Sequence, residues 1–215
     1  MVKVKIWDGM VRLFHWGSVA LLPLCWFTAE QGMMEWHMTC AYLLMVLLMV
    51  RLLWGFIGTT TARFNHFVRR PGAVLHYLFN WHAHERPYFG HNPAGGYMVV
   101  VMMLLLMAQV MTGLFATDDI LAEGPLSSSV SGALAGTMTS LHHWFFDLIV
   151  VTVLMHLCAI VFYRINGVNL VEAMITGYGM TAGGRRSNAV APICWLVPLV
   201  LVGGTVLYWL ILPLW

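Results

Sequence analysis

Five long apolar stretches dominate this chain of 215 residues and limit what it can fold into. Each is close to the roughly 20 residues that a helix needs to cross a bilayer. Hydrophobic residues make up 60% of the chain and charged residues only 9%, against roughly 25% charged in soluble domains. The sequence therefore predicts an all-α membrane protein, with spans at residues 12–30, 36–57, 96–117, 141–163 and 191–213.

Basic residues are distributed unevenly between these spans. The loops between spans one and two and between spans three and four contain no Lys or Arg. They carry the acidic residues Glu30, Glu35, Asp118, Asp119 and Glu123. By the positive-inside rule, the N-terminus is predicted to be cytoplasmic and the acidic loops periplasmic, and five spans then put the C-terminus outside. The net charge of +2 is too small to indicate a nucleic-acid partner. Ten of the eleven basic residues lie at or before the start of span one, between spans two and three, or after span four: Lys3, Lys5 and Arg12, then Arg63, Arg69, Arg70 and Arg86, then Arg164, Arg185 and Arg186.

Shorter segments complete the predicted organisation. An interfacial helix is expected from Pro71 to about Ala83, with proline in its first turn. Asn169 with Glu172 resembles a helix cap and Gly177 a terminator, so a surface helix is expected near 170–176. The Gly/Ser-rich stretch 118–136 is expected to be an external loop. Residues 1–180 are predicted to form the bundle, with a cytoplasmic loop at 58–95, and 181–215 a linker and an additional span.

Histidines in or at the ends of the spans fall into two pairs by depth. His37 and His142 or His143 lie near the outer ends of spans two and four, and His15 and His156 lie in the inner halves of spans one and four. The fourteen residues from His142 to His156 correspond to about 21 Å and nearly four whole turns, so both imidazoles share one helix face. We therefore predict His142 as the ligand, while His143 has a possible partner in Asp147 one turn further on.

Paired imidazoles in apolar surroundings are typical axial ligands of haem iron. Zinc and di-iron sites gather their ligands in one cluster and often recruit Cys or carboxylates, whereas each pair here has two histidines and no acid between them. The sequence has no C-x-x-C-H motif for covalent attachment. Two non-covalent b-type haems are therefore expected. Iron with both axial positions filled has no vacant site for oxygen, which favours one-electron transfer.

Haem propionates need cations or hydrogen-bond donors near the membrane surface. Three arginines at the basic ends of the spans are candidates for this role, with snorkelling to the interface as the alternative: Arg12, Arg51 and Arg164. For the outer haem no arginine is evident. Its propionates would need backbone groups, water, or the side chains of Trp36, Trp144 and His143.

Several motifs occur together in one order along residues 5–180: WDGMVRLFHW, HMTCAYLLMVLLMVRLLWGFIG, RFNHFVRRP, GHNPAGG, LHHW followed by His156, and NLVEAMITG. This set resembles the bacterial di-haem cytochrome b561 family, which includes the b-type subunits of nickel–iron hydrogenases and partners of periplasmic c-type cytochromes. The resemblance implies a four-helix bundle in the bacterial inner membrane, with two b haems held by His15, His37, His142 and His156. His143 is a departure, since many relatives have an acid there.

The resemblance also implies exchange with membrane quinone. We place the quinone hypothetically on the cytoplasmic side, where polar residues converge beside the inner haem: His15, Arg51, Trp54, His91 and Asn92. The leading hypothesis is an electron-transfer subunit between the quinone pool and a periplasmic c-type cytochrome or hydrogenase-like protein. The alternative is a stand-alone enzyme, such as a superoxide:quinone oxidoreductase, which would turn over without a protein partner. A metal-ion transporter using the histidines is a third class and predicts flux without haem.

Overall fold

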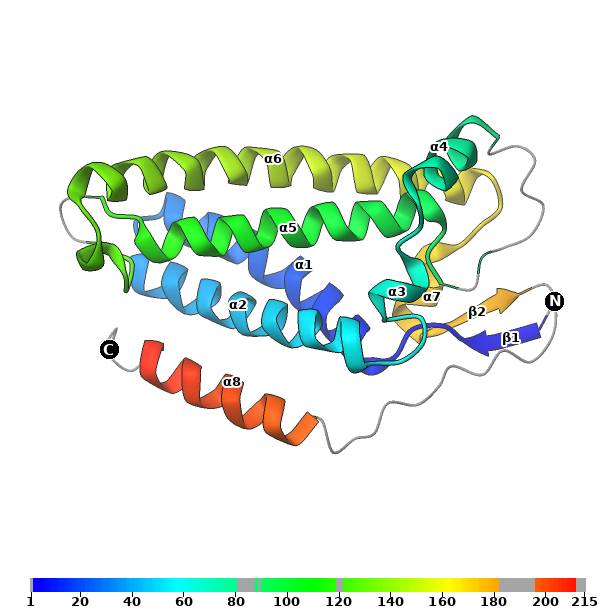
Figure 1. Cartoon of the computed structure of the whole chain (residues 1–215), viewed down its shortest axis with the longest axis horizontal. Helices are drawn as coiled ribbons and strands as arrows, with labels where there is room; N and C mark the ends of the chain where they lie inside the picture. The colour runs from blue at the N-terminus through cyan, green and yellow to red at the C-terminus, as the bar shows by residue number, and fades with distance from the viewer. Residues whose placement is uncertain (1, 81–87, 89, 119–121, 182–195, 212–215) are drawn as a thin grey trace. The chain divides into compact units, whose positions relative to one another are not determined.

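The computed structural model of the chain describes residues 2–80, 88, 90–118, 122–181 and 196–211. It is mostly helical, with one pair of short strands (Figure 1). In chain order the elements are β1 (Val2–Lys5), α1 (Gly9–Glu30), α2 (Met34–Ile57), α3 (Phe64–Phe67), α4 (Pro71–Phe79), α5 (Pro93–Phe115), the 3-10 turn η2 (Ser127–Ser129), α6 (Gly132–Ile165), α7 (Leu170–Thr176), β2 (Tyr178–Thr181) and α8 (Leu196–Ile211).

Four of these helices are long and apolar enough to cross a membrane, namely α1, α2, α5 and α6. They confirm four of the five predicted spans and the all-α membrane fold. The fifth predicted span, 191–213, is represented by α8, which has 16 residues within the described part of the chain. The rest of that predicted span lies outside the described residues, as does the end of the interfacial helix predicted to reach Ala83; α4 does begin at Pro71, as expected.

Helix α6 is longer than the sequence suggested. It begins at Gly132, nine residues before the predicted start of the span, so the prediction of an external loop through residue 136 was wrong for its last part. The preceding segment folds back on the end of α5, because Gly124 N–H donates to the Ala116 carbonyl at 2.8 Å. The Thr139 hydroxyl accepts from the Thr117 amide at 3.0 Å and donates to the Thr117 carbonyl at 2.9 Å. These tertiary bonds fix the extra turns of α6.

The chain divides into two compact units, and each long helix contributes residues to both. Unit 1 contains Met1–Trp16, Met49–Val100 and His156–Pro198, and unit 2 contains Gly17–Leu48, Val101–Met155 and Leu199–Trp215. The division predicted near residue 180 stays a prediction, since residues 182–195 are outside the described part.

In unit 1 a segment near the N-terminus and a segment after α7 meet in a short antiparallel ribbon. Strand β1 pairs with β2, with Val2 opposite Thr181 and Lys5 opposite Tyr178. Before the ribbon, α7 has the predicted cap, since the Glu172 amide donates to the Asn169 side chain at 3.2 Å. It has the predicted terminator too, since Gly177 adopts a φ of 84° that favours glycine. The Gly177 carbonyl then accepts from the amides of Ile6 and Trp7.

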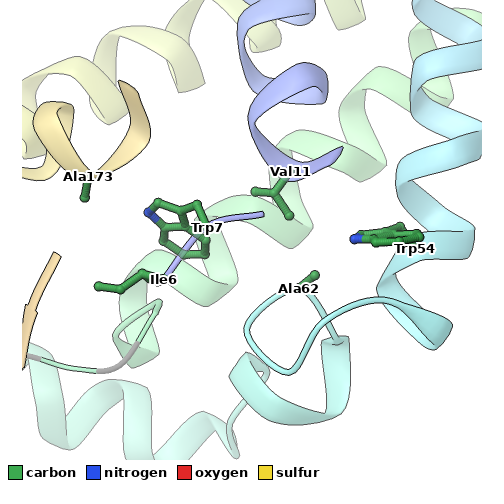
Figure 2. Close-up of a cluster of buried hydrophobic side chains, with 6 residues drawn as sticks. All are labelled: Ile6, Trp7, Val11, Trp54, Ala62 and Ala173. Carbon is green, nitrogen blue, oxygen red and sulfur yellow. The ribbon is translucent and has the colours of Figure 1, made fainter. Parts of the chain in front are cut away.

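Unit 1 contains a buried hydrophobic cluster (Figure 2), formed by Ile6, Trp7, Val11, Trp54, Ala62 and Ala173. The buried Asp8 carboxylate accepts hydrogen bonds from residues in and around this cluster. The Asp8 carboxylate accepts from the Val11 amide at 2.8 Å, which caps the start of α1. It also accepts from the Trp54 indole at 2.9 Å and from the Thr59 hydroxyl. The cluster thus joins α1, α2 and α7, and the Asp8 carboxylate links α1 to α2.

Candidate functional site

Unit 2 brings the predicted outer histidines together. The ring centroids of His37 and His142 lie 6.3 Å apart. His37 Nδ1 donates to the Cys25 carbonyl at 2.8 Å, and His142 Nδ1 donates to the Gln109 carbonyl at 2.9 Å. Because a carbonyl can only accept, each Nδ1 carries a proton, and in a neutral imidazole the lone pair is then on Nε2. Such a hydrogen bond on the far nitrogen is the usual support of a metal-binding imidazole.

The surroundings of His142 include residues that the sequence reasoning missed. A Cβ added at Gly113 would meet His142 Cε1 at 2.8 Å, so only glycine lets the ring pack this closely against α5. The Gln109 side-chain amide donates to His142 Nε2 at 3.1 Å and so occupies the lone pair of that atom, which means that Gln109 has to turn away before Nε2 can bind a metal. Gln109 Oε1 is buried without a hydrogen-bond partner among the described residues. An amide in an otherwise apolar span was the available signal, since polar groups in membranes are costly and usually functional.

Unit 1 brings together the predicted inner histidines. The ring centroids of His15 and His156 lie 6.4 Å apart. His15 Nδ1 is shielded from solvent and has no hydrogen-bond partner within the described residues. Trp16 packs edge-on against the His15 ring at 4.9 Å. A buried nitrogen without a partner, in a ring close to a second imidazole, indicates a site that a further group could complete.

The ring separations can be compared with those expected for one iron between two imidazoles. A nitrogen–metal bond is about 2.0 Å, and a five-membered ring with bonds of about 1.33 Å places its nitrogen roughly 1.1 Å from the centroid. Two such halves give about 6.2 Å between centroids. The observed values are 6.4 Å and 6.3 Å. Both ring separations therefore match the distance expected when two imidazoles bind one metal ion.

Unit 1 contains two further polar side chains with buried nitrogen atoms, those of Arg51 and His91. Arg51 is 3% exposed, lies over the Phe64 ring at 5.6 Å, and has a buried Nη1 without a partner among the described residues. The His91 ring lies 4.6 Å from Trp7 and 4.9 Å from Phe67, and its Nδ1 is also buried and unpartnered there. Burial, followed by the positive charge of Arg51, lowers the pKa of His91 to about 3. His91 is therefore neutral near pH 7.

The other residues predicted for the quinone site already make hydrogen bonds. Trp54 uses its N–H on Asp8. Asn92 caps α5 by accepting from the Gly95 amide at 2.7 Å and donates to the Tyr163 hydroxyl at 2.7 Å. Tyr163 is in turn bonded to Tyr77 of α4 at 2.5 Å. Trp54 and Asn92 thus hold the elements around His91 in place.

The two remaining arginines predicted to bind propionates differ in their surroundings. Arg12 donates through Nε to the Met174 carbonyl at 3.2 Å and through Nη2 to the Ile175 carbonyl, which ties α1 to the end of α7. Arg164 is exposed at the end of α6. Their propionate roles stay predictions. In unit 2 three suggested outer donors are exposed: Trp36, Trp144 and His143.

A profile of the family described as prokaryotic cytochrome b561 matches residues 6–177, four fifths of the chain. The chain belongs to the prokaryotic cytochrome b561 family. A cytochrome b561 is a membrane b-type cytochrome of electron transfer that binds b-type haem, and the four apolar helices fit a bacterial inner membrane. No curated protein and no solved structure matches this cytochrome b561.

Proposed function

We propose that this cytochrome b561 holds two b-type haems, one in each unit. His15 and His156 would be the axial ligands in unit 1, and His37 and His142 those in unit 2. The observation that carries the proposal is the ring separation of both pairs, 6.4 Å and 6.3 Å. A haem held in this way supplies one-electron redox chemistry without a vacant iron site. The protein's part is to hold the imidazoles in orientation, through the Cys25 and Gln109 carbonyls in unit 2.

The charge distribution supports one orientation of the chain in the membrane. All eleven Lys and Arg residues lie in the sequence ranges of unit 1, and unit 2 has six acidic residues and neither Lys nor Arg. By the positive-inside rule, the ends of the spans in unit 1 face the cytoplasm, and those in unit 2 face the periplasm. The N-terminus is then cytoplasmic. A periplasmic c-type cytochrome or hydrogenase-like protein would exchange electrons with the haem of unit 2.

In unit 1, Arg51 is suited to bind an anion, and His91 is suited to bind an uncharged hydrogen-bond acceptor. The unpartnered Arg51 Nη1 is suited to a haem propionate, since guanidinium donors pair well with carboxylates. The neutral His91 imidazole can donate a hydrogen bond to a quinone carbonyl from a site away from water. Single electrons would pass between quinone at unit 1 and the partner at unit 2.

Haem stoichiometry tests the ligand assignment. We expect a pyridine haemochrome assay to give two b haems per chain, His37→Ala and His156→Ala to leave one each, and His143→Ala to leave two. A single haem in the unaltered protein, or two haems in His156→Ala, would contradict the proposal.

The quinone assignment needs a separate measurement. Purified oxidised protein is mixed with a quinol, and haem reduction is followed by stopped-flow absorbance. We expect His91→Ala to slow this reduction while retaining both haems, and His143→Ala to leave its rate unchanged. An unaltered rate in His91→Ala would remove His91 from the quinone site.

A further inference from the structure

Helix α4 of unit 1 is apolar on the side that faces away from the protein. Its buried side chain is Tyr77. Leu75 and Phe79 lie roughly 160° around the helix from Tyr77, and Leu78 lies roughly 100° from it. Leu75 is 55% exposed, Leu78 54% and Phe79 82%, which is the largest fraction among the described large hydrophobic side chains. The described residues of unit 1 therefore leave the outer side of α4 uncovered.

Two contacts hold α4 beside the ends of two membrane-spanning helices. Tyr97, near the start of α5, donates its hydroxyl to the Arg69 carbonyl at 3.0 Å. The Tyr77 hydroxyl lies 2.5 Å from that of Tyr163, which is in the last turn of α6. With nine residues, α4 is about 14 Å long and too short to cross a bilayer. Its exposed apolar side chains therefore lie at the level where α5 begins and α6 ends, which is where interfacial helices lie.

The chain next to α4 is basic. Arg69 and Arg70 directly precede the helix, and both are exposed. Residues 58–80 contain Arg63 as a third basic residue and no Asp or Glu that could neutralise the three charges. Guanidinium groups bind phosphate oxygens with strong, often paired hydrogen bonds. Basic residues beside a segment at the membrane surface attract anionic lipid headgroups, so the charge of this segment complements an anionic bilayer surface.

We propose that α4 binds anionic phospholipid of the bilayer that the chain itself crosses. Arg69 and Arg70 bind the headgroup phosphates, and the exposed apolar side chains of α4 enter the apolar layer. We call these residues the α4 surface: Arg69, Arg70, Leu75, Leu78 and Phe79. Lipid is the occupant because the contacts to Tyr97 and Tyr163 already hold α4 at the edge of the bilayer. The proposal does not depend on the haem ligands, so its tests use no haem signal.

Retained lipid tests the charged part of the α4 surface. The full chain is purified in mild detergent with equal amounts of phosphatidylglycerol and phosphatidylcholine, and native mass spectrometry counts the bound lipid molecules. We expect the unaltered chain to prefer phosphatidylglycerol. A basic residue near an anionic surface favours binding by roughly fivefold, so Arg69→Gln with Arg70→Gln should weaken this preference by up to about 30-fold. Its unfolding midpoint should not change, because the exchange keeps the Arg69 carbonyl that Tyr97 binds.

The matched control is Lys3→Gln with Lys5→Gln. It removes the same charge from two exposed residues of β1. We expect this control to keep the preference for phosphatidylglycerol. Equal losses in the two double variants would show that lipid binding follows net charge alone and would overturn the proposal, as would an unaltered chain without any preference.

A depth measurement tests the apolar part of the α4 surface. Cys158, which is exposed, and Cys194 are first replaced by serine, while the other two cysteines are buried. A nitroxide on Phe79→Cys or on Lys5→Cys is then followed by electron paramagnetic resonance in nanodiscs of the same two lipids, with oxygen as the collider in the membrane and a nickel complex as the collider in water. We expect oxygen to dominate at residue 79 and nickel at residue 5. Dominance of nickel at residue 79 overturns the proposal, since the outer side of α4 would then face water or a protein partner.

Discussion

Replacing Gly113 by alanine tests how closely the structure defines the haem ligand in unit 2. The added methyl carbon would lie 2.8 Å from His142 Cε1 and 3.2 Å from Nδ1. Carbon atoms in contact prefer about 3.5 Å or more, so the ring has to move by roughly 0.7 Å. Metal–ligand distances in a real site vary by only about 0.2 Å. The displacement is therefore too large to leave iron ligation intact.

The same movement disturbs the hydrogen bond from His142 Nδ1 to the Gln109 carbonyl, now 2.9 Å long. Loss of such a support typically lowers metal affinity by about 10- to 100-fold. Helix propensity acts in the opposite direction, because alanine stabilises a helix by about 1 kcal/mol relative to glycine. We therefore expect Gly113→Ala to bind its second haem at least about 10-fold more weakly while the apoprotein unfolds at a similar or higher temperature.

The assay is haem titration of the apoprotein followed by absorbance, which separates the two binding steps. Gly204→Ala is the matched control, because nothing lies within 4 Å of a Cβ added at Gly204 in α8. We expect this control to bind both haems normally. If Gly113→Ala binds two haems with unchanged affinity and spectrum, the placement of His142 against α5 is wrong.

Three further predictions concern unit 1. Asp8→Ala should lower the free energy of unfolding by about 1–3 kcal/mol, because it leaves the buried Trp54 N–H and Thr59 hydroxyl unpaired; thermal unfolding of the haem-loaded protein measures this. Gly177→Ala should also destabilise, by about 1 kcal/mol or more, since φ is 84° and the new Cβ would lie 2.8 Å from a carbonyl oxygen; a midpoint equal to that of the unaltered chain would contradict this. The pKa of His91 falls from 6.5 when unfolded to about 3 when folded, so the unfolded state binds more protons between these values and stability falls as the pH is lowered from about 6.5 toward 3; His91→Phe should reduce the pH dependence of unfolding there by up to one proton.

The sequence was sufficient to predict four of the spans and to predict which histidines lie close together. An imidazole in an apolar segment stands out, and helix periodicity relates His142 to His156 without knowledge of neighbours. Local capping was equally readable, since Asn169, Glu172 and Gly177 act within one turn of chain. These features depend on residues that are near in sequence or on the one direction that the membrane provides.

Features that depend on contacts between helices could not be predicted from the sequence. The extra turns of α6 are fixed by Thr139 on Thr117, which overrides the loop-like composition of that stretch. Gly113 matters because His142 of another helix packs on it, and one sequence cannot show that approach. Arg12 has the charge and position expected for a propionate partner, but its donors bind carbonyls of α7, which lie 162 and 163 residues along the chain.

The ribbon of β1 and β2 has a consequence for the order of folding. Val2–Lys5 leave the ribosome before the four membrane-spanning helices but pair with Tyr178–Thr181, which follow them. At about 5–20 residues per second, the first strand waits roughly 9 to 35 seconds for its partner, until four spans have been synthesised. His15 waits almost as long for His156. The two strands can therefore pair only after the fourth membrane-spanning helix has been synthesised. Until then β1 has no strand partner and stays accessible to chaperones and proteases.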